Sequence, residues 1–433
     1  MDTTNSTAPW QRHPAFALPA VPAELAEQAT AAGWPEHIVA RAVALRIDRG
    51  AIEAWLRESY PTPEMLDQWL TGQEALWGST LVVRTATWSD QDLLVDLYAH
   101  SPETVDDWTV TVERSPNPYA GFRLQEHAFV LVLEDQRVGL GAVTHSARNT
   151  LVAGIETSVH VITAWRVRDG LRGMGFSNQL LMAPGPGTAR FGLITYWYGR
   201  SGNSSRAWID HVVQDLANRP EEWSVTVDGL TATVQYFPTS AMARTDSRVR
   251  PVTIDDLPRC VELINGTHRG LDLFRPYTVE FLREHLDDQM WGPKPWFASS
   301  VYGWDDYAVI ELDGEIVACG GLWDRGESMR EHWLSSVDST SFVVDPTAVM
   351  DFGFAEGHDD LMAALVEHFL ARSADRGRSG MLAPLEFLPS ILDRCRHLNP
   401  VPDQRTLEVM PFISPQLKVD LPITRPYTDL AYW

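Results

Sequence analysis

The spacing of apolar and polar positions changes character near residue 80. Before that point, apolar residues recur at the three- and four-residue spacing of amphipathic helices in four segments, 22–32, 35–49, 51–59 and 63–76. Pro35 and Pro63 stand where proline commonly opens a helix. We therefore expect a helical module over 21–78. It follows a Thr-, Ser-, Pro- and Ala-rich segment, 1–20, that we expect to be a flexible tail.

From Leu81 onward the pattern predicts short strands alternating with helices, and this pattern occurs twice. Three segments of the first region pair with three of the second: 83–93 with 249–257, 129–143 with 307–318, and 158–167 with 341–346. A repeat of this size predicts two domains of one fold. We place the first copy at 79–238 and the second at 248–433, with a polar linker at 239–247.

A glycine-containing turn follows the predicted strand 158–167. It reads Arg172-Gly173-Met174-Gly175-Phe176-Ser177-Asn178, and a helical pattern begins at Leu180. The N–H groups at the start of a helix bind phosphate, and glycine lets a ligand approach the backbone closely. A dinucleotide fingerprint would need glycine in place of Asn178, and a Walker loop would need a lysine. The turn therefore predicts a different kind of phosphate loop, with Arg172 as a charged partner.

This spacing, Arg/Gln-x-x-Gly-x-Gly/Ala with Ser177 in the last small position, resembles the acyl-CoA loop of the GNAT superfamily of N-acyltransferases. The resemblance covers about residues 80–430. It implies an α/β (α+β) fold of two tandem GNAT-like domains, each a central mixed sheet flanked by helices. It also implies acetyl-CoA or another acyl-CoA as the cofactor. The implied CoA-binding residues are Trp165, Arg166 and Val167 on the strand, Arg172, Gly173, Met174, Gly175, Phe176, Ser177 and Asn178 in the loop, and Asn203.

Transfer to an amine requires a group that accepts a proton and a group that returns one to the CoA thiolate. For the base, the fourth strand offers Glu156 and His160, and His145 ends the third strand. The family's usual acid is a tyrosine at the eighth position of the motif that Asn203 begins, but Asp210 occupies that position here. Tyr198 is our substitute, with Tyr196, Ser204 and Ser205 as further options. A lone histidine or glutamate at a strand end more often has a surface or hydrogen-bonded role, and a tyrosine in a strand is usually a packing residue.

The second copy departs from the loop pattern. We place its loop at Met350–Asp360, where Gly353 and Ala355 match the spacing but Met350 replaces the arginine or glutamine. Asp351 and three further acids crowd this position and would repel a pyrophosphate. We therefore expect a degenerate domain that helps to shape the substrate cleft.

Composition limits the partners. The formal net charge of −23 on 433 residues opposes binding to nucleic acid and to anionic membranes. No apolar run reaches the length of a membrane span, and Met1–Arg12 lacks the apolar core of a signal peptide. The three cysteines form no Cys-x-x-Cys pair, so we expect no disulfide scaffold and no metal site. We expect a cytoplasmic monomer or homodimer.

Together, these expectations predict an N-acyltransferase that moves an acyl group from acyl-CoA to the amine of a small metabolite. The expected acyl group is acetyl. The acceptor nitrogen would attack the thioester directly. One alternative is other CoA chemistry, such as thioester hydrolysis, O-acylation or decarboxylation. Another is a non-catalytic acyl-CoA-binding or scaffold protein. CoA release without an amine would indicate the first alternative, and binding without turnover the second.

Overall fold

The computed structural model describes most of the chain and divides it into two compact units. The described ranges are 20–44, 49–57, 81–114, 128–135, 138–171, 194–199, 228–239, 243–287, 302–411 and 423–432, with isolated residues between them. Unit 1 comprises Met1–Ala86, Phe129–Thr144 and Ala164–Gly192, and unit 2 comprises Thr87–Ala128, His145–Thr163 and Leu193–Trp433. The predicted boundaries of the two copies stay predictions.

Unit 1 begins with a small helical cluster. Its described helices are α1 (Ala23–Ala31), α2 (Glu36–Ala44) and α3 (Arg49–Arg57). Leu25, Ile38 and Ile52 lie in their shared apolar core, as the helical spacing in the sequence predicts. The predicted helix at 63–76 falls mostly outside the described residues.

Unit 1 also contains an antiparallel pair of strands. β1 (Leu81–Thr85) pairs with β4 (Phe129–Asp135), and β4 adjoins the first part of β5 (Val138–Val152), which confirms the predicted hairpin at 129–143. Arg84 on β1 forms an ion pair with Glu134 on β4 at 2.8 Å. The end of β6 (Ile155–Val167) lies beside β5.

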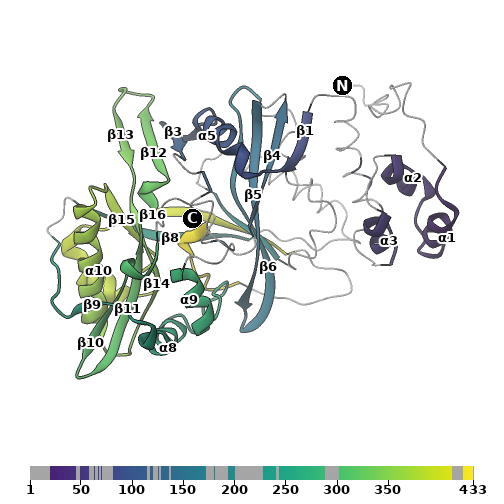
Figure 1. Ribbon diagram of the computed structural model, residues 1–433. Coiled ribbons are helices and arrows are strands. Elements are labelled where there is room, and N and C mark those ends of the chain that lie inside the picture. The colour runs from purple at the N-terminus through teal and green to yellow at the C-terminus, as the bar shows by residue number, and fades with distance from the viewer. Residues whose placement is uncertain are drawn as a thin grey trace. The chain divides into compact units, whose positions relative to one another are not determined.

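Unit 2 contains a long mixed sheet with helices on both faces (Figure 1). Its strand order is β5-β6-β7-β16-β8-β15-β14-β11-β10-β9, where β5 and β6 contribute the residues that belong to this unit. The strands not yet bounded are β7 (Ile194–Gly199), β8 (Asp228–Pro238), β9 (Val249–Pro251), β10 (Tyr307–Leu312), β11 (Glu315–Trp323), β14 (Thr347–Phe354), β15 (Gly380–Ala383) and β16 (Val401–Pro411).

Two apolar cores lie on the two faces of this sheet. α8 (Leu257–Thr267) and α9 (Val279–Asp287) pack on one face, where Leu263 and Leu282 are buried. α10 (Asp359–Asp375) and α11 (Pro389–Arg394) pack on the other, where Phe369 and Ile391 are buried. Helices on both faces bury strands such as β14 completely, and such strands are apolar almost throughout.

Both copies open with the same strand, turn and helix. α5 (Gln91–Ala99) and α8 each follow a short 3-10 turn that an aspartate caps. Asp90 accepts a hydrogen bond from the Thr87 backbone N–H at 2.6 Å, and Asp256 accepts one from the Thr253 N–H at 2.7 Å. Each aspartate also accepts the threonine hydroxyl at 2.9 Å. Short polar side chains satisfy the free N–H groups of a helix start, so this part of the repeat was visible in the sequence.

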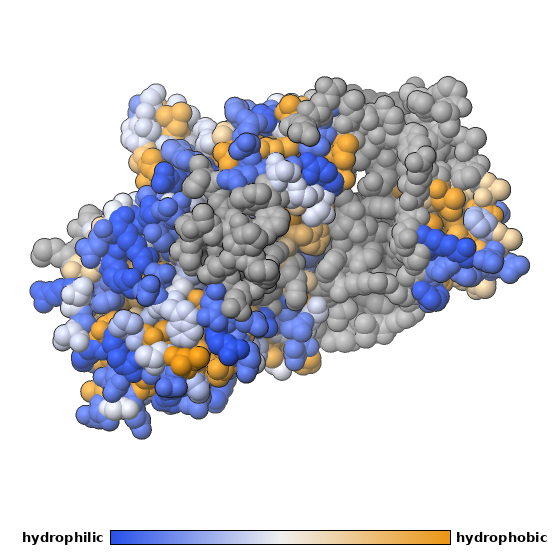
Figure 2. All heavy atoms as spheres, in the orientation of Figure 1, coloured by the Kyte–Doolittle hydropathy of each residue, from blue (hydrophilic) through white to orange (hydrophobic). Residues whose placement is uncertain are grey.

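A second, four-stranded antiparallel sheet in unit 2 corrects one prediction. Its order is β13 (Ser341–Val344), β12 (Arg330–Ser335), β3 (Trp108–Glu113) and β2 (Glu103–Val105). The segment 341–346 was predicted to be the strand before the helix of the second copy, but that strand is β14. Figure 2 shows apolar side chains on the β12–β13 hairpin, where Phe342 and Val337 are exposed.

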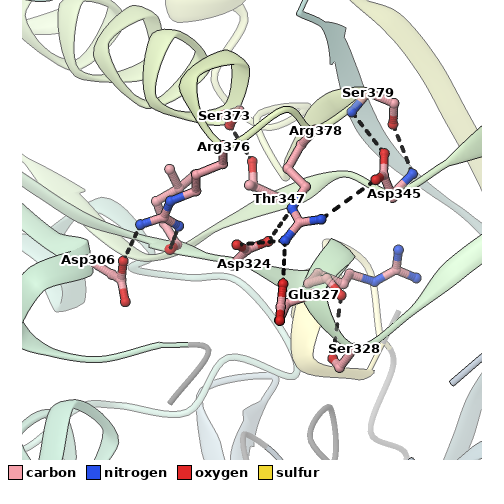
Figure 3. A network of polar contacts seen from close by, with 12 residues as sticks. Asp306, Asp324, Glu327, Ser328, Asp345, Thr347, Ser373, Arg376, Arg378 and Ser379 are labelled. Carbon is pink, nitrogen blue, oxygen red and sulfur yellow. Dashed lines mark hydrogen bonds and ion pairs between the residues drawn. The ribbon is translucent and has the colours of Figure 1, made fainter. Parts of the chain in front are cut away.

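A polar network fixes the starts of β14 and β15 next to each other (Figure 3). Asp345 and Ser379 exchange two hydrogen bonds of 2.9 Å, each from one residue's backbone N–H to the other's side chain. Arg378 forms ion pairs with Asp324 and Glu327, each at 2.7 Å. Several charge-assisted contacts at one point therefore hold the starts of these two strands together.

Candidate functional site

In each copy, two neighbouring parallel strands pair over a few residues only. β6 pairs with β7 from Val159 to Val161, and β14 pairs with β15 at Thr347 and Ala348. Beyond these positions β6 continues to Val167 and β14 to Phe354. Open α/β sheets bind ligands beyond the carboxyl ends of their parallel strands.

Each of the two strands has a residue with positive φ at the same position. Ala164 in β6 and Asp351 in β14 both have φ 50°, and each lies three residues after the last pair and three before the strand ends. The register of β14 with β11 shifts next to Asp351, as expected at a β-bulge. Non-glycine residues rarely adopt positive φ, and those that do concentrate at functional sites.

The same turn follows both strands. Leu171 N–H donates to the Arg168 carbonyl and His358 N–H donates to the Ala355 carbonyl, both at 3.1 Å. Gly170 (φ 79°) and Gly357 (φ 86°) supply the left-handed residue of each turn. The two copies therefore share one backbone path from the bulge to the turn, with Ala164 equivalent to Asp351.

This equivalence corrects the predicted position of the second-copy loop. Met350–Phe354 lies inside β14, and the turn comes after it. Gly353 is required by packing, since a Cβ there would lie 2.3 Å from the backbone nitrogen of Ile264 in α8. Counted from the bulge, the residues equivalent to Arg172 and Gly173 are Asp359 and Asp360, in the first turn of α10. The second copy thus has two acids where the first has arginine and glycine.

Side chains fill the region around the second-copy bulge. The carboxylate of Asp351 accepts hydrogen bonds from the Tyr277 hydroxyl at 2.6 Å, the Tyr302 hydroxyl at 2.7 Å and His285 Nδ1 at 3.0 Å. Burial disfavours the ionised form, but the attraction of His285 and these hydrogen bonds outweigh it and lower the pKa of Asp351. An aspartate within an apolar run was the one signal of this cluster in the sequence.

In the first copy, His160 is the middle one of three buried, hydrogen-bonded side chains in unit 2. Its Nε2 lies 2.9 Å from Nδ1 of His145 on β5, and its Nδ1 lies 3.3 Å from the hydroxyl of Thr195 on β7. Burial lowers the pKa of His160 to about 4, so the ring is neutral at neutral pH and its protonated form is disfavoured. Glu156 is exposed near the start of β6, four residues from His160.

Tyr198 lies on the opposite face of the strands from His160. His160 and Thr195 are register partners, so Tyr196 and Tyr198 point the other way, with their rings 5.9 Å apart. The Tyr198 hydroxyl donates to the Tyr427 carbonyl at 3.4 Å. Burial, and then the negative charge of Asp429, raise the pKa of Tyr198 above its usual value. The structure therefore does not bring the predicted base and the predicted acid together.

The CoA-binding residues predicted on β6 form its last three positions. Trp165 and Arg166 are half-buried, Val167 is buried, and the Arg166 guanidinium donates to the Trp165 carbonyl at 2.8 Å. The remaining predicted CoA-binding residues lie outside the described residues: Arg172, Gly173, Met174, Gly175, Phe176, Ser177, Asn178 and Asn203.

Within the described ranges, no group of three or more His, Cys, Asp or Glu side chains is arranged to hold a metal ion. In the same part of the chain, no helix is long and apolar enough to cross a membrane.

Comparison with known proteins gives matches in structure only. No protein-family model and no curated protein sequence matches the chain. A Saccharomyces cerevisiae N-myristoyltransferase structure with bound myristoyl-CoA has a TM-score of 0.51 at 11% identity, covering 77% of this chain and 82% of that one. A second structure of that enzyme, with myristoyl-CoA and inhibitors, has a TM-score of 0.52 at 10% identity, covering 77% and 80%.

A GCN5-related N-acetyltransferase from Sphaerobacter thermophilus has a TM-score of 0.44 at 12% identity, covering 82% of this chain and 99% of that one. The structural neighbours are acyltransferases, and the two similarities above 0.5 extend over more than three quarters of the chain. The predicted α/β class is confirmed. The chain shares its overall fold with N-myristoyltransferase.

Proposed function

We propose that the protein is an acyl-CoA-dependent N-acyltransferase. The observation that carries this proposal is the backbone path of β6, in a fold shared with an enzyme that was crystallised with myristoyl-CoA. The positive φ at Ala164 and the turn at Gly170 come just before the sequence Arg172-Gly-Met-Gly-Phe-Ser177. Arg172 and the following N–H groups are suited to bind the pyrophosphate of CoA.

The chemistry requires one bond exchange and two proton transfers. The acceptor nitrogen attacks the thioester carbonyl carbon, the C–S bond breaks, and the thiolate gains a proton. Backbone N–H groups that a bulge releases from the ladder are suited to polarise the carbonyl. His160, neutral at neutral pH, is our proposed proton acceptor, with exposed Glu156 as the option through water. Tyr198 lies on the other face of the strands from His160. It can therefore serve as the acid only if the CoA thiolate lies on the face of Tyr198.

For the donor and acceptor we propose acetyl-CoA and a small cationic amine. The support is the net charge of −23, which attracts cations and repels nucleic acid. Myristoyl-CoA and a peptide amine are the alternatives that the structural neighbours raise. We also propose that the protein acts in the cytoplasm, where a small soluble acceptor is available, and that it is a monomer or homodimer.

The test is amine-dependent release of CoA. Purified protein is incubated with acetyl-, octanoyl- or myristoyl-CoA and with spermidine, lysine or a short peptide. Free thiol is followed by absorbance, and N-acylated products are identified by mass spectrometry. Acyl transfer predicts CoA release that requires the amine. Release without any amine would instead indicate thioester hydrolysis, and binding without release a non-catalytic acyl-CoA protein.

A pair of variants tests the assignment of the loop. Gly175→Trp fills the predicted pyrophosphate cradle and is expected to weaken acetyl-CoA binding at least tenfold, measured by calorimetry. Asp360→Trp, at an exposed position in the first turn of α10, is the control in the second copy and is expected to leave binding unchanged. The reverse result would mean that the second copy holds the cofactor.

A further inference from the structure

Unit 2 contains a cavity of about 260 Å³ that none of the predicted site residues lines. Its walls come from four segments: β8 at 231–233, Leu271 after α8, the turn 384–387 after β15, and 425–428 near the end of the described chain. Its size is just below the range of about 300–1,000 Å³ that is usual for drug-sized ligands. The cavity therefore suits a smaller molecule.

The cavity exists because β15 is short. β15 pairs with β8 from Gly380 opposite Pro238 to Ala383 opposite Gln235, and the register stops there. Pro384 follows, which has no N–H to continue the ladder. β8 continues past this point, paired on its other edge with β16. The edge of β8 at 231–233 is thus left beside the open space.

The wall at 425–428 is held in place by one buried carboxylate. Asp272 Oδ2 accepts hydrogen bonds from the backbone N–H groups of Thr424 at 2.8 Å and Arg425 at 3.2 Å. The Asp272 N–H in turn donates to the Arg425 carbonyl at 2.9 Å. The backbone at Arg425 is therefore fixed before any ligand arrives, and this reduces the entropy lost on binding.

The lining combines an apolar wall with polar groups. Leu271, Phe387 and Pro426 supply apolar surface. Thr233 is a buried part of the β8 wall.

Two opposite charges complete the lining. Arg425 and Glu386 are both exposed and both line the cavity. Within the described part of the chain, neither side chain forms an ion pair. A guanidinium recognises a carboxylate through paired hydrogen bonds, and a carboxylate recognises an ammonium group.

We infer that this cavity binds a small zwitterion, namely an α-amino acid with an apolar side chain. Its carboxylate pairs with Arg425, its ammonium group pairs with Glu386, and its side chain packs against Leu271 and Phe387. This site stands apart from acyl transfer, so it can be tested whether or not that activity is found.

Calorimetry with the full chain tests the inference. The probes are L-leucine, leucinamide, which lacks the carboxylate, and 4-methylpentanoate, which lacks the ammonium group. L-Leucine is expected to bind, and each analogue is expected to bind at least tenfold more weakly. No heat of binding with L-leucine, L-phenylalanine or L-methionine at millimolar concentration would overturn the inference.

Two variants assign the groups. Arg425→Gln is expected to remove the preference for leucine over leucinamide, and Glu386→Gln the preference over 4-methylpentanoate. The exposed Arg283→Gln and Glu315→Gln are matched controls. Leucine binding that survives Arg425→Gln with its selectivity intact would contradict the assignment.

Discussion

The strand-to-turn segments of the two copies share a backbone and differ in side chains. β6 and β14 each have a non-glycine residue with positive φ at the same distance from the strand end, followed by the same glycine turn. This residue is Ala164 in one copy and Asp351 in the other. After the turn, one sequence continues with Arg172 and the other with Asp359. The backbone conformation is therefore common to the two copies, and the side chains placed on it decide what each copy can bind.

The second copy uses this geometry for stability. Asp351 gathers two tyrosine hydroxyls and a histidine in the buried space beside the bulge. His268 packs nearby between aromatic rings, with its centroid 4.8 Å from that of Phe274 and 4.9 Å from that of Phe352. An alanine at the bulge, as in the first copy, brings no such cluster. The comparison thus predicts that mutations at equivalent positions act on stability in one copy and on binding in the other.

The largest expected effect is at Gly353. Gly353→Val places side-chain atoms against the backbone of α8, so we expect a loss of about 5 kcal/mol in the free energy of unfolding. The equivalent position in the first copy is Arg166, which is half-buried. Urea titration of Gly353→Val and Arg166→Val measures the difference. Equal losses would show that the two strands are packed alike.

Removal of the buried carboxylate comes next. Asp351→Ala leaves Tyr277, Tyr302 and His285 without their shared acceptor, and we expect a loss of about 4 kcal/mol. Acetyl-CoA affinity should not change, because this cluster belongs to the second copy. Asp360→Ala, at an exposed site, is the control in the same denaturation series. A change in CoA affinity without a change in stability would mean that the second copy, and not the first, binds CoA.

A pH-dependent effect follows from the buried histidines. Burial lowers the pKa of His268 to about 4, while the unfolded side chain titrates near 6.5. Between these values the unfolded chain binds a proton that the native state does not, so stability falls as the pH falls from 6.5 to 4. The expected contribution is about 3 kcal/mol across this window.

His268→Phe should therefore flatten the pH dependence of the free energy of unfolding between pH 6.5 and 4. Urea titrations at several pH values measure the slope, and the exposed His37→Gln serves as the control. His160, with a pKa also lowered to about 4, gives the matching experiment in the first copy. A slope that is unchanged in His268→Phe would show that this histidine does not stay neutral in the native protein.

The smallest effect tests the shared backbone itself. Gly170 and Gly357 both have positive φ, and a Cβ would meet no atom within 4 Å at either. Alanine should therefore act only through backbone conformation and destabilise by about 1 kcal/mol at each position. Similar shifts of the melting temperature in Gly170→Ala and Gly357→Ala would support the equivalence. A shift of the melting temperature in one variant alone would contradict the equivalence of the two turns.

Local signals made part of this fold predictable. The capped turns at Thr87 and Thr253 and the hairpin at 129–143 depend on short polar residues and alternation, which are visible in the sequence. β14 was misplaced for two physical reasons. A strand buried on both faces shows no alternation, and Gly353, required by α8, imitates a loop glycine. The bulge at Asp351 left no signal that distinguishes a buried aspartate from a loop aspartate.

The candidate site was predictable to a different degree. The sequence placed Trp165, Arg166 and Val167 on a strand, and they lie at the end of β6. It did not show that His160 and Tyr198 lie on opposite faces, because that depends on the register of β6 with β7. Register is a tertiary property, fixed by the pairing of distant segments.

The carboxylate of Asp272 also has a consequence for local unfolding. Its Oδ1 accepts the N–H of Ala153 at the β5–β6 hairpin, 119 residues away, and its Oδ2 accepts that of Thr424, 152 residues away. Opening of the segment around Asp272 exposes both amides to solvent at once. Where this opening is the dominant route, the amides of Ala153 and Thr424 should exchange at similar rates, as one cooperative unit assembled from three distant parts of the chain.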